Sequence, residues 1–342
     1  MRTLDIKGVN GDSRILVGEK LERLGSYLPV QRPVVITDTT VEGLYGDKFP
    51  NCDLIKISTG EKIKNLDTVR YIYDQLVDHE ADRSTFIVGI GGGIVCDIAG
   101  FVASTYMRGL RFGFVSSTLL AQVDASVGGK NGVNFHGYKN MIGTFNQPEF
   151  VICDMDLLKT LPKREVLCGL AEIAKHAFIG DASMCDYLER NFERALDLDE
   201  EAIGKLVYDS VVIKSGVVNM DEREKGERKK LNFGHTFGHA IEKTTDAFLH
   251  GEAISVGMVV ASQLSVTKTL LLPSDFERIK ELLVKLDLPT TLRADKDMMV
   301  DAIKKDKKRV GDDIDFVLLE GIGKAVIRKI SVKELEEAVS DL

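Results

Sequence analysis

Three of the chain's six histidines lie close together in the sequence, at His235, His239 and His250. His235 and His239 are four residues apart, so on a helix they share one face, a spacing that can hold a divalent metal ion such as Zn²⁺. Glu172 could add a carboxylate from an earlier segment. The residue types therefore predict a divalent metal bound by some subset of these four side chains. The alternative is an ordinary pair of histidines on a helix surface or in a core.

A glycine cluster forms a second candidate site. The segment 89–93 reads Gly-Ile-Gly-Gly-Gly, between a predicted strand and an apolar segment. Glycines there let backbone N–H groups approach a pyrophosphate at the positive end of a helix, although a tight structural turn would need the same residues. The usual dinucleotide fingerprint has its acidic residue after the glycines, whereas Asp38 precedes them. Asp38 could still bind a ribose hydroxyl, and Asp97 could cap the helix or bond nearby.

Positive charge and glycine coincide again between residues 118 and 140. Glycines bracket Lys130, and Lys139 and Asn140 follow shortly afterwards. This combination supplies a flexible backbone and cationic donors, which suits a small polyanionic ligand better than a structural turn.

Two further charged positions in this region are open to more than one interpretation. Asp124 lies in an otherwise apolar segment, 119–127, that we expect to be helical. A carboxylate there is costly unless it is paired, which favours a functional role. Arg108 and Arg111 add cations nearby in sequence, and either could equally be an ordinary surface arginine.

The elements that must position these residues follow two different periodicities. Up to about residue 150, short β-branched runs alternate with amphipathic segments, which predicts a Rossmann-like α/β domain with a largely parallel sheet. We expect strands at 33–38, 53–57, 84–90 and 112–116, and a helix at 66–79. Farther on, helical patterns dominate, at 163–179, 199–221, 233–245, 252–269, 274–286 and 331–341, with a hairpin from 314–319 and 325–330. Two domains are predicted, α/β over 1–150 and mostly α-helical over 151–342.

The overall composition excludes several classes of protein. The 342 residues are 44% hydrophobic and 29% charged, with a formal net charge of −8, so no basic field invites nucleic acid or an anionic membrane. The five cysteines are scattered and form no C-x-x-C pair, as in a reduced cytoplasmic protein. The N-terminus lacks the apolar segment of a secretion signal, and the most apolar window, 253–266, is too short to span a bilayer.

Taken together, these segments closely resemble the 3-dehydroquinate synthase family, within the sugar-phosphate cyclases. The matching motifs follow the family order from about Asp38 to the lysines near 307, and read GIGGGIVCDIAGFVAST, STLLAQVDASVGGKNGVN, KNMIGTF, GLAEIAKH, LNFGHTFGHAIE and LHGEA. The resemblance implies a dehydroquinate synthase-like fold, with an NAD-binding α/β domain at 1–150 and a helical metal- and substrate-binding domain at 151–342. It also implies a homodimer.

The resemblance implies a role for individual residues as well. Glu172, His235 and His250 would ligate Zn²⁺ or Co²⁺, and His239 would face the substrate phosphate. NAD would contact a set of residues from the first domain: Asp38, Glu61, Lys64, Gly91, Gly92, Gly93, Asp97, Thr118, Leu119, Asp124, Lys130 and Lys139. The substrate would be held by Lys130, Lys139, Asn140, Lys175, Lys214, Arg228, Asn232 and Lys307, with Glu224 near its hydroxyls and Arg108 reaching across a dimer interface.

The implied reaction converts 3-deoxy-D-arabino-heptulosonate 7-phosphate (DAHP) into 3-dehydroquinate and phosphate, in the shikimate pathway of aromatic amino acid biosynthesis. NAD⁺ transiently oxidises a ring hydroxyl that Zn²⁺ polarises, phosphate leaves by β-elimination, the hydride returns, and an intramolecular aldol reaction closes the ring. A substrate with two anionic ends explains the lysines and arginines of an acidic chain. The departures from the family pattern are small: Ser116-Ser117, Asn131, Cys96, and a slightly short segment between His239 and His250.

Three other functions compete with this interpretation. Sister cyclases make aminodehydroquinate, 2-deoxy-scyllo-inosose or valiolone-type rings, and those with uncarboxylated substrates need no arginine for a carboxylate. Arg228, Asn232 and His239 favour a carboxylated substrate, which leaves aminodehydroquinate synthesis the hardest to exclude. Metal-dependent polyol dehydrogenases generally have aspartate where this chain has Glu172, and they lack the segment around Lys130. An inactive binding protein is disfavoured because no matched site residue is missing.

Overall fold

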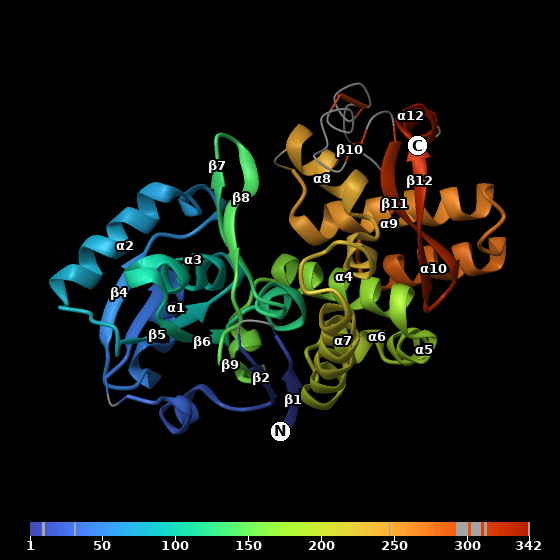
Figure 1. The fold of residues 1–342 in the computed structure, drawn as a ribbon. Coiled ribbons are helices and arrows are strands. Elements are labelled where there is room, and N and C mark those ends of the chain that lie inside the picture. The colour runs from blue at the N-terminus through green and yellow to red at the C-terminus, as the bar shows by residue number, and fades with distance from the viewer. Residues whose placement is uncertain are drawn as a thin grey trace. The chain divides into compact units, whose positions relative to one another are not determined.

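A computed structural model describes the chain except for residues 9–10, 31, 246, 292–299, 302–308, 311–312 and 341–342. The chain divides into two compact units, Met1–Leu161 and Pro162–Leu342, which are coloured blue to green and green to red in Figure 1. The division falls later than the boundary expected at 150, because the strand Phe150–Cys153 pairs within the sheet of the first unit.

A seven-stranded sheet forms the centre of the first unit, in the order β1-β2-β9-β6-β5-β3-β4. Its strands are β1 (Arg2–Ile6), β2 (Ser13–Val17), β3 (Val34–Asp38), β4 (Asp53–Ile57), β5 (Phe86–Gly91), β6 (Arg111–Ser116) and β9 (Phe150–Cys153). Only the β1–β2 pair is antiparallel among the strand pairs described for this sheet. Every residue of β5 is buried, as is typical of a central parallel strand covered on both faces. The predicted α/β architecture is confirmed.

Of the helices that pack on this sheet, α2 (Leu66–Asp78) confirms the helix predicted at 66–79. The others are α1 (Thr39–Tyr45) and α3 (Gly93–Thr105), with short 3-10 segments η1 (Leu21–Tyr27), η2 (Gly46–Lys48), η3 (Glu61–Ile63), η4 (Tyr106–Arg108) and η6 (Met155–Thr160). In α2 the buried residues are Val69, Ile72 and Leu76, spaced by three and four, so one stripe faces the core. By contrast, α3 is buried on most sides, and it begins directly after the glycines that end β5.

The segment expected to be a flexible anion-binding loop is instead a β-hairpin. Strand β7 (Lys130–Phe135) pairs antiparallel with β8 (Tyr138–Phe145), and Gly132 lies opposite Gly143. A Cβ at Gly132 would lie 2.7 Å from the Ile142 carbonyl oxygen, so the glycine permits the close approach of two backbones. The helix expected over 119–127 is also different: it contains a π-helical turn, η5 (Ala121–Ala125), and ends before Val127.

The second unit is mostly helical, as predicted. Its helices are α4 (Lys163–Gly180), α5 (Ala182–Arg190), α6 (Phe192–Leu196), α7 (Glu200–Met220), α8 (His235–Thr244), α9 (His250–Thr267), α10 (Pro273–Lys285) and α12 (Val332–Ser340), with a 3-10 segment η7 (Glu227–Asn232). The late hairpin is confirmed as β11 (Asp313–Gly321) and β12 (Lys324–Ser331), joined by β10 (Arg309–Val310) in an antiparallel sheet. None of the helices in the described ranges is long and apolar enough to cross a membrane.

Two helices form the interior of this unit. Fourteen consecutive residues of α4, from Val166 to Ile179, are buried, and α9 is buried along most of its length. Helix α9 contacts both α4 and α8, and these three helices lie together in Figure 1. Because their sequences are apolar on nearly every side, the charged side chains that they do carry are placed in the core.

Candidate metal centre and active site

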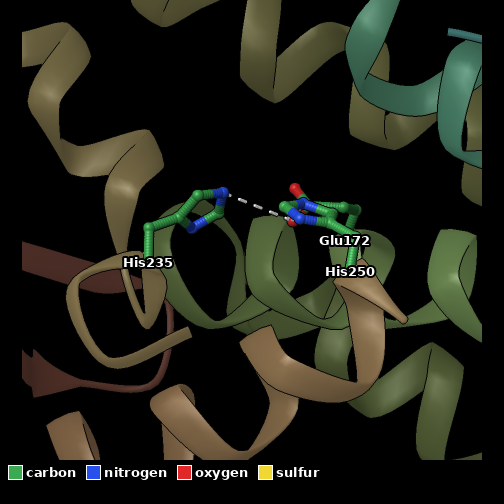
Figure 2. A group of neighbouring side chains, drawn as sticks. All are labelled: Glu172, His235 and His250. Atoms are coloured by element: carbon green, nitrogen blue, oxygen red, sulfur yellow. Dashed lines mark ion pairs between the residues drawn. The ribbon is translucent and has the colours of Figure 1, made fainter. Parts of the chain in front are cut away.

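Three side chains from three different helices converge in the second unit. Glu172 lies on α4, His235 begins α8 and His250 begins α9. One ligand atom of each lies within 4.8 Å of the other two. The Nε2 atoms of both histidines are 3.7 Å from the same oxygen, Oε1 of Glu172. Figure 2 shows the imidazole of His235 pointing toward Glu172 and His250, so the three groups face a common point.

Close backbone contacts of α9 bring these residues together. A Cβ at Gly251 would lie 2.3 Å from Cα of Cys168 on α4, and a Cβ at Gly257 would lie 2.0 Å from the carbonyl oxygen of Gly234. Neither position can carry a side chain without moving backbone. Gly234 itself has a φ of 78°, a left-handed conformation that lets the chain turn into α8. The glycines thus place His250 beside α4.

The outer nitrogen of each imidazole has its own partner. Nδ1 of His235 lies 3.1 Å from the carbonyl oxygen of Phe233, and Nδ1 of His250 lies 3.3 Å from Oε1 of Glu242. Partners of this kind fix the orientation of a ring and decide which nitrogen presents its lone pair. In both rings the nitrogen left facing Glu172 is Nε2.

Burial and neighbouring charges set the protonation of the site. Lys175 forms an ion pair with Oε2 of Glu172, and both side chains are almost completely buried. Burial and the Lys175 ammonium hold the pKa of His235 well below its usual range, so this imidazole is neutral, as a metal ligand must be. Burial also lowers the pKa of His250, but the carboxylates of Glu172 and Glu242 outweigh it and raise that pKa to about 9. A bound divalent cation would displace this proton.

The donor set fits a catalytic zinc site. One carboxylate oxygen and two imidazole nitrogens form a three-ligand set that leaves a coordination position for water or substrate. His239 is a neighbour of this group and not a member of it, with its ring centroid 5.2 Å from that of His235 and 6.4 Å from that of His250. The sequence spacing left the choice among the histidines open, and the structure brings His235 and His250 together with Glu172.

The other predicted substrate contacts of this unit are buried cations and their neighbours. Lys175 lies on α4, Lys214 on α7 and Arg228 on η7, and these elements are in mutual contact. All three side chains are less than a tenth exposed. Asn232, also on η7, donates a hydrogen bond to Oε1 of Glu224 at 2.5 Å. Lys307 lies outside the described residues.

In the first unit, the glycine segment 91–93 forms an open helix N-terminus. Gly92 is the N-cap of α3 and supplies no side chain to its backbone N–H groups. A Cβ at Gly92 would lie 3.0 Å from Thr118 Cγ2, and a Cβ at Gly93 would lie 2.8 Å from Ala125 Cβ. N–H groups that no side chain caps, at the positive end of a 13-residue helix, suit a pyrophosphate.

The acidic residues near this N-terminus have other partners as well. Asp38 ends β3, which pairs directly with β5, and its carboxylate caps α1 by accepting from the N–H groups of Thr40 and Val41 at 2.9 Å. Asp97 forms an ion pair with Lys64 and does not cap α3. Glu61 accepts a hydrogen bond from Asn134 on the β7–β8 hairpin at 2.7 Å.

The remaining predicted residues of this unit are distributed as follows. Thr118 accepts from the N–H of Ala121 at 3.1 Å, and Leu119 is fully buried. Asp124 is half-buried on the π-helical turn. Lys130, Lys139 and Asn140 are exposed on the hairpin, and Arg108 is exposed at a φ of 70° in η4.

Known proteins match this chain over nearly its full length. Residues 54–168 match the 3-dehydroquinate synthase N-terminal family, and residues 169–309 match the 3-dehydroquinate synthase C-terminal family. The chain belongs to the 3-dehydroquinate synthase family. A 3-dehydroquinate synthase from Campylobacter concisus is 44% identical over 340 residues, which is 97% of this chain and 96% of the relative. One from Desulforamulus reducens is 42% identical over 332 residues, or 92% of each chain.

Solved structures of sister cyclases share the fold of this 3-dehydroquinate synthase family member. A 2-deoxy-scyllo-inosose synthase complexed with carbaglucose-6-phosphate, NAD⁺ and Co²⁺ has a TM-score of 0.89 at 27% identity, covering 99% of this chain and all of that one. A 2-epi-5-epi-valiolone synthase from Streptomyces hygroscopicus, with NAD⁺ and Zn²⁺ bound, has a TM-score of 0.90 at 28% identity, covering 100% and 99%. The predicted dehydroquinate synthase-like fold is confirmed.

A more distant structure shares the fold alone. Glycerol dehydrogenase from Schizosaccharomyces pombe has a TM-score of 0.68 at 17% identity, over 96% of this chain and 88% of that one.

The sequence interpretation did not include Glu242, which contacts His250. Its signal was nevertheless present: Glu242 closes the motif LNFGHTFGHAIE and lies two helical turns after His235, so the two share a face of α8. In this 3-dehydroquinate synthase family member, α8 thus contributes both a candidate ligand and the partner of a second one.

Proposed function

We propose that the chain is a 3-dehydroquinate synthase that converts DAHP into 3-dehydroquinate and phosphate, with NAD⁺ and a divalent metal, Zn²⁺ or Co²⁺. The observation that carries the proposal is the convergence of Glu172, His235 and His250 in a chain that matches this family over nearly its full length. The cofactors are supported by the sister cyclases, which bind NAD⁺ together with Co²⁺ or Zn²⁺.

Each cofactor would have its own set of residues. Glu172, His235 and His250 would hold the metal, and the N-terminus of α3 at 91–93 would hold the pyrophosphate of NAD, with Asp38 close by at the end of the adjacent strand. When bound, the metal would polarise a substrate oxygen as a Lewis acid, and NAD⁺ would take and return a hydride. A transient oxidation of this kind makes the neighbouring C–H acidic enough for phosphate to leave by elimination.

The chain's own cations would bind and orient the substrate. Lys175 is fixed beside Glu172 by their ion pair, so its ammonium would donate to substrate oxygens next to the metal. Lys214 and Arg228 are buried cations on elements that contact α4. A guanidinium and an ammonium are suited by charge and geometry to the carboxylate and phosphate of DAHP. His239, next to His235, would contact the phosphate.

Polar side chains on the same element as Arg228 and just before it would form hydrogen bonds with the substrate hydroxyls. Asn232 and Glu224 are held to each other by a hydrogen bond, which pre-orients a donor and an acceptor. Glu224 has a φ of 58°, and strained backbone of this kind is common at functional sites. The β7–β8 hairpin would contribute polar side chains to NAD or substrate binding, namely those of Lys130, Lys139 and Asn140.

The proposal extends to the state of the enzyme in the cell. We infer a cytoplasmic homodimer in which Arg108 contributes to the neighbouring site. Support comes from the exposure of Arg108 and from the left-handed backbone that it shares with Met107. The scattered free cysteines suit a reducing compartment.

The activity can be tested with purified protein, DAHP, NAD⁺ and Zn²⁺. We expect release of one phosphate per DAHP, a product with the mass of 3-dehydroquinate, and no net NADH. Amino-DAHP, tested in parallel, should be turned over less efficiently. No phosphate from DAHP by protein that has bound zinc and NAD⁺ would refute the proposal, and accumulation of NADH with glycerol-like alcohols would favour a polyol dehydrogenase.

A further inference from the structure

A second carboxylate lies behind one of the candidate metal ligands. Oε1 of Glu242 is 3.3 Å from Nδ1 of His250, and the Glu242 side chain is only 8% exposed. The imidazole of His250 therefore lies between two carboxylates, because its Nε2 is 3.7 Å from Oε1 of Glu172. Glu172 belongs to the three-ligand group and Glu242 does not.

The two carboxylates must act differently on this ring. A neutral imidazole carries one N–H and one lone pair, and the partner of one nitrogen decides which form the other takes. A carboxylate can only accept, so at Nδ1 of His250 it selects the form with the proton on that nitrogen. The lone pair then lies on Nε2, the nitrogen that faces Glu172.

The two histidines of the site have unequal partners. His235 faces a neutral carbonyl, that of Phe233, whereas His250 faces a carboxylate. Both histidines begin a helix, where the positive end of the helix dipole opposes the binding of another cation. The side chain of His250 is 28% exposed, compared with 10% for His235, so packing restrains it less. His250 is the ligand that most needs an anionic partner.

We propose that Glu242 is a positioning residue of the metal centre, which accepts a hydrogen bond from Nδ1–H of His250 and directs the Nε2 lone pair at the ion. Its charge also offsets the α9 dipole. This inference rests on the proposed function, since it requires a metal at Glu172, His235 and His250. Metal-bound histidines commonly donate to a carboxylate in this way, and losing that partner typically weakens metal binding about 10- to 100-fold.

The test compares zinc affinity across a small set of variants of the full chain. Glu242→Ala removes the acceptor, and Glu242→Gln keeps an acceptor oxygen and the side-chain size but loses the charge. Glu281→Gln is the matched control, because Glu281 is exposed on α10. Each protein is titrated with zinc against a chromophoric chelator, loaded with Co²⁺ for its visible absorption spectrum, and checked for folding by circular dichroism and thermal unfolding.

We expect zinc affinity to fall about 10- to 100-fold in Glu242→Ala and by a smaller factor in Glu242→Gln, with an altered cobalt spectrum in both. Glu281→Gln should match the wild type.

Should Glu242→Ala fail to fold, Glu242→Gln alone decides. The inference would be overturned if the deciding variant bound zinc within about two-fold of wild type and kept the wild-type cobalt spectrum, since the expected loss of affinity is larger. Complete loss of zinc in Glu242→Gln would also overturn it, by making Glu242 a ligand. Absence of stoichiometric zinc in the wild type would instead contradict the proposed function itself.

Discussion

Lys175 forms a buried ion pair with Oε2 of Glu172, one helical turn earlier on α4. The pair assigns different tasks to the two oxygens of one carboxylate, because Oε1 is left facing Nε2 of both His235 and His250. A cation next to a metal site would ordinarily compete with the metal. Here it orients the carboxylate and compensates its second oxygen, so a candidate metal ligand and the cation that orients it lie on the same helix.

Removing a histidine ligand should remove the metal while leaving the fold intact. In His250→Ala we expect substoichiometric zinc and loss of cyclase activity, because only two of the three ligands remain. The side chain is 28% exposed and lies at the start of α9, so its loss should have little effect on packing. Elemental analysis and circular dichroism provide the measurements, and stoichiometric zinc in folded His250→Ala would count against the assignment.

Glu172→Gln should be the less stable of the two ligand variants. It removes zinc and also leaves Lys175 buried without its carboxylate, and breaking a buried pair typically costs about 3–5 kcal/mol of unfolding free energy. Replacing Lys175 by methionine in the same chain should restore part of that loss. Denaturant unfolding of the metal-free single and double variants measures this, and a double variant that is no more stable than Glu172→Gln would show that the pair is not the cause.

Arg228→Ala should damage the binding of carboxylated substrate more than turnover. Losing a charged hydrogen-bond donor to the substrate should lower kcat/KM by about 10- to 100-fold, mostly through KM. Arg190→Ala is a suitable control, since Arg190 is exposed on α5. Steady-state phosphate release gives both constants, and unchanged kcat/KM in Arg228→Ala would refute the role.

Gly251→Ala should weaken both the fold and the metal site. Its Cβ would lie 2.3 Å from Cα of Cys168, so α9 must move away from α4 and carry His250 with it. We expect a loss of about 1–3 kcal/mol of stability together with reduced zinc affinity. Gly204→Ala on α7, where the added Cβ meets no atom within 4 Å beyond its own stretch of helix, should be neutral or slightly stabilising. Equal stability of both alanine variants would show that the α4–α9 contact tolerates a side chain.

Much of the fold could be predicted because its strands and helices have clear periodicities. The parallel strands β3, β5 and β6 are buried along most of their length, and α2 has a regular buried stripe. The N-terminal strands β1 and β2 were not predicted. The glycines near Lys130 look like a loop in the sequence, and only pairing with a second strand shows that they permit a tight hairpin.

The candidate site was harder to derive from the sequence, because its geometry depends on helix packing. The spacing of His235 and His239 indicates a shared helical face, but no local pattern places His250 against α4. The family resemblance named Glu172, His235 and His250. The structure shows that they converge, and that α9 approaches α4 closely where Gly251 meets Cys168. Glu242 needed the structure for the same reason, since its partner begins another helix.

The most direct test of the central claim is to locate the metal. Crystals of the zinc-loaded enzyme, measured on both sides of the zinc absorption edge, should show one strong anomalous peak at about 2.0–2.2 Å from a carboxylate oxygen of Glu172 and from Nε2 of both His235 and His250. A peak at any other place, or zinc-loaded crystals without a peak among these three side chains, would contradict the assignment of this metal centre.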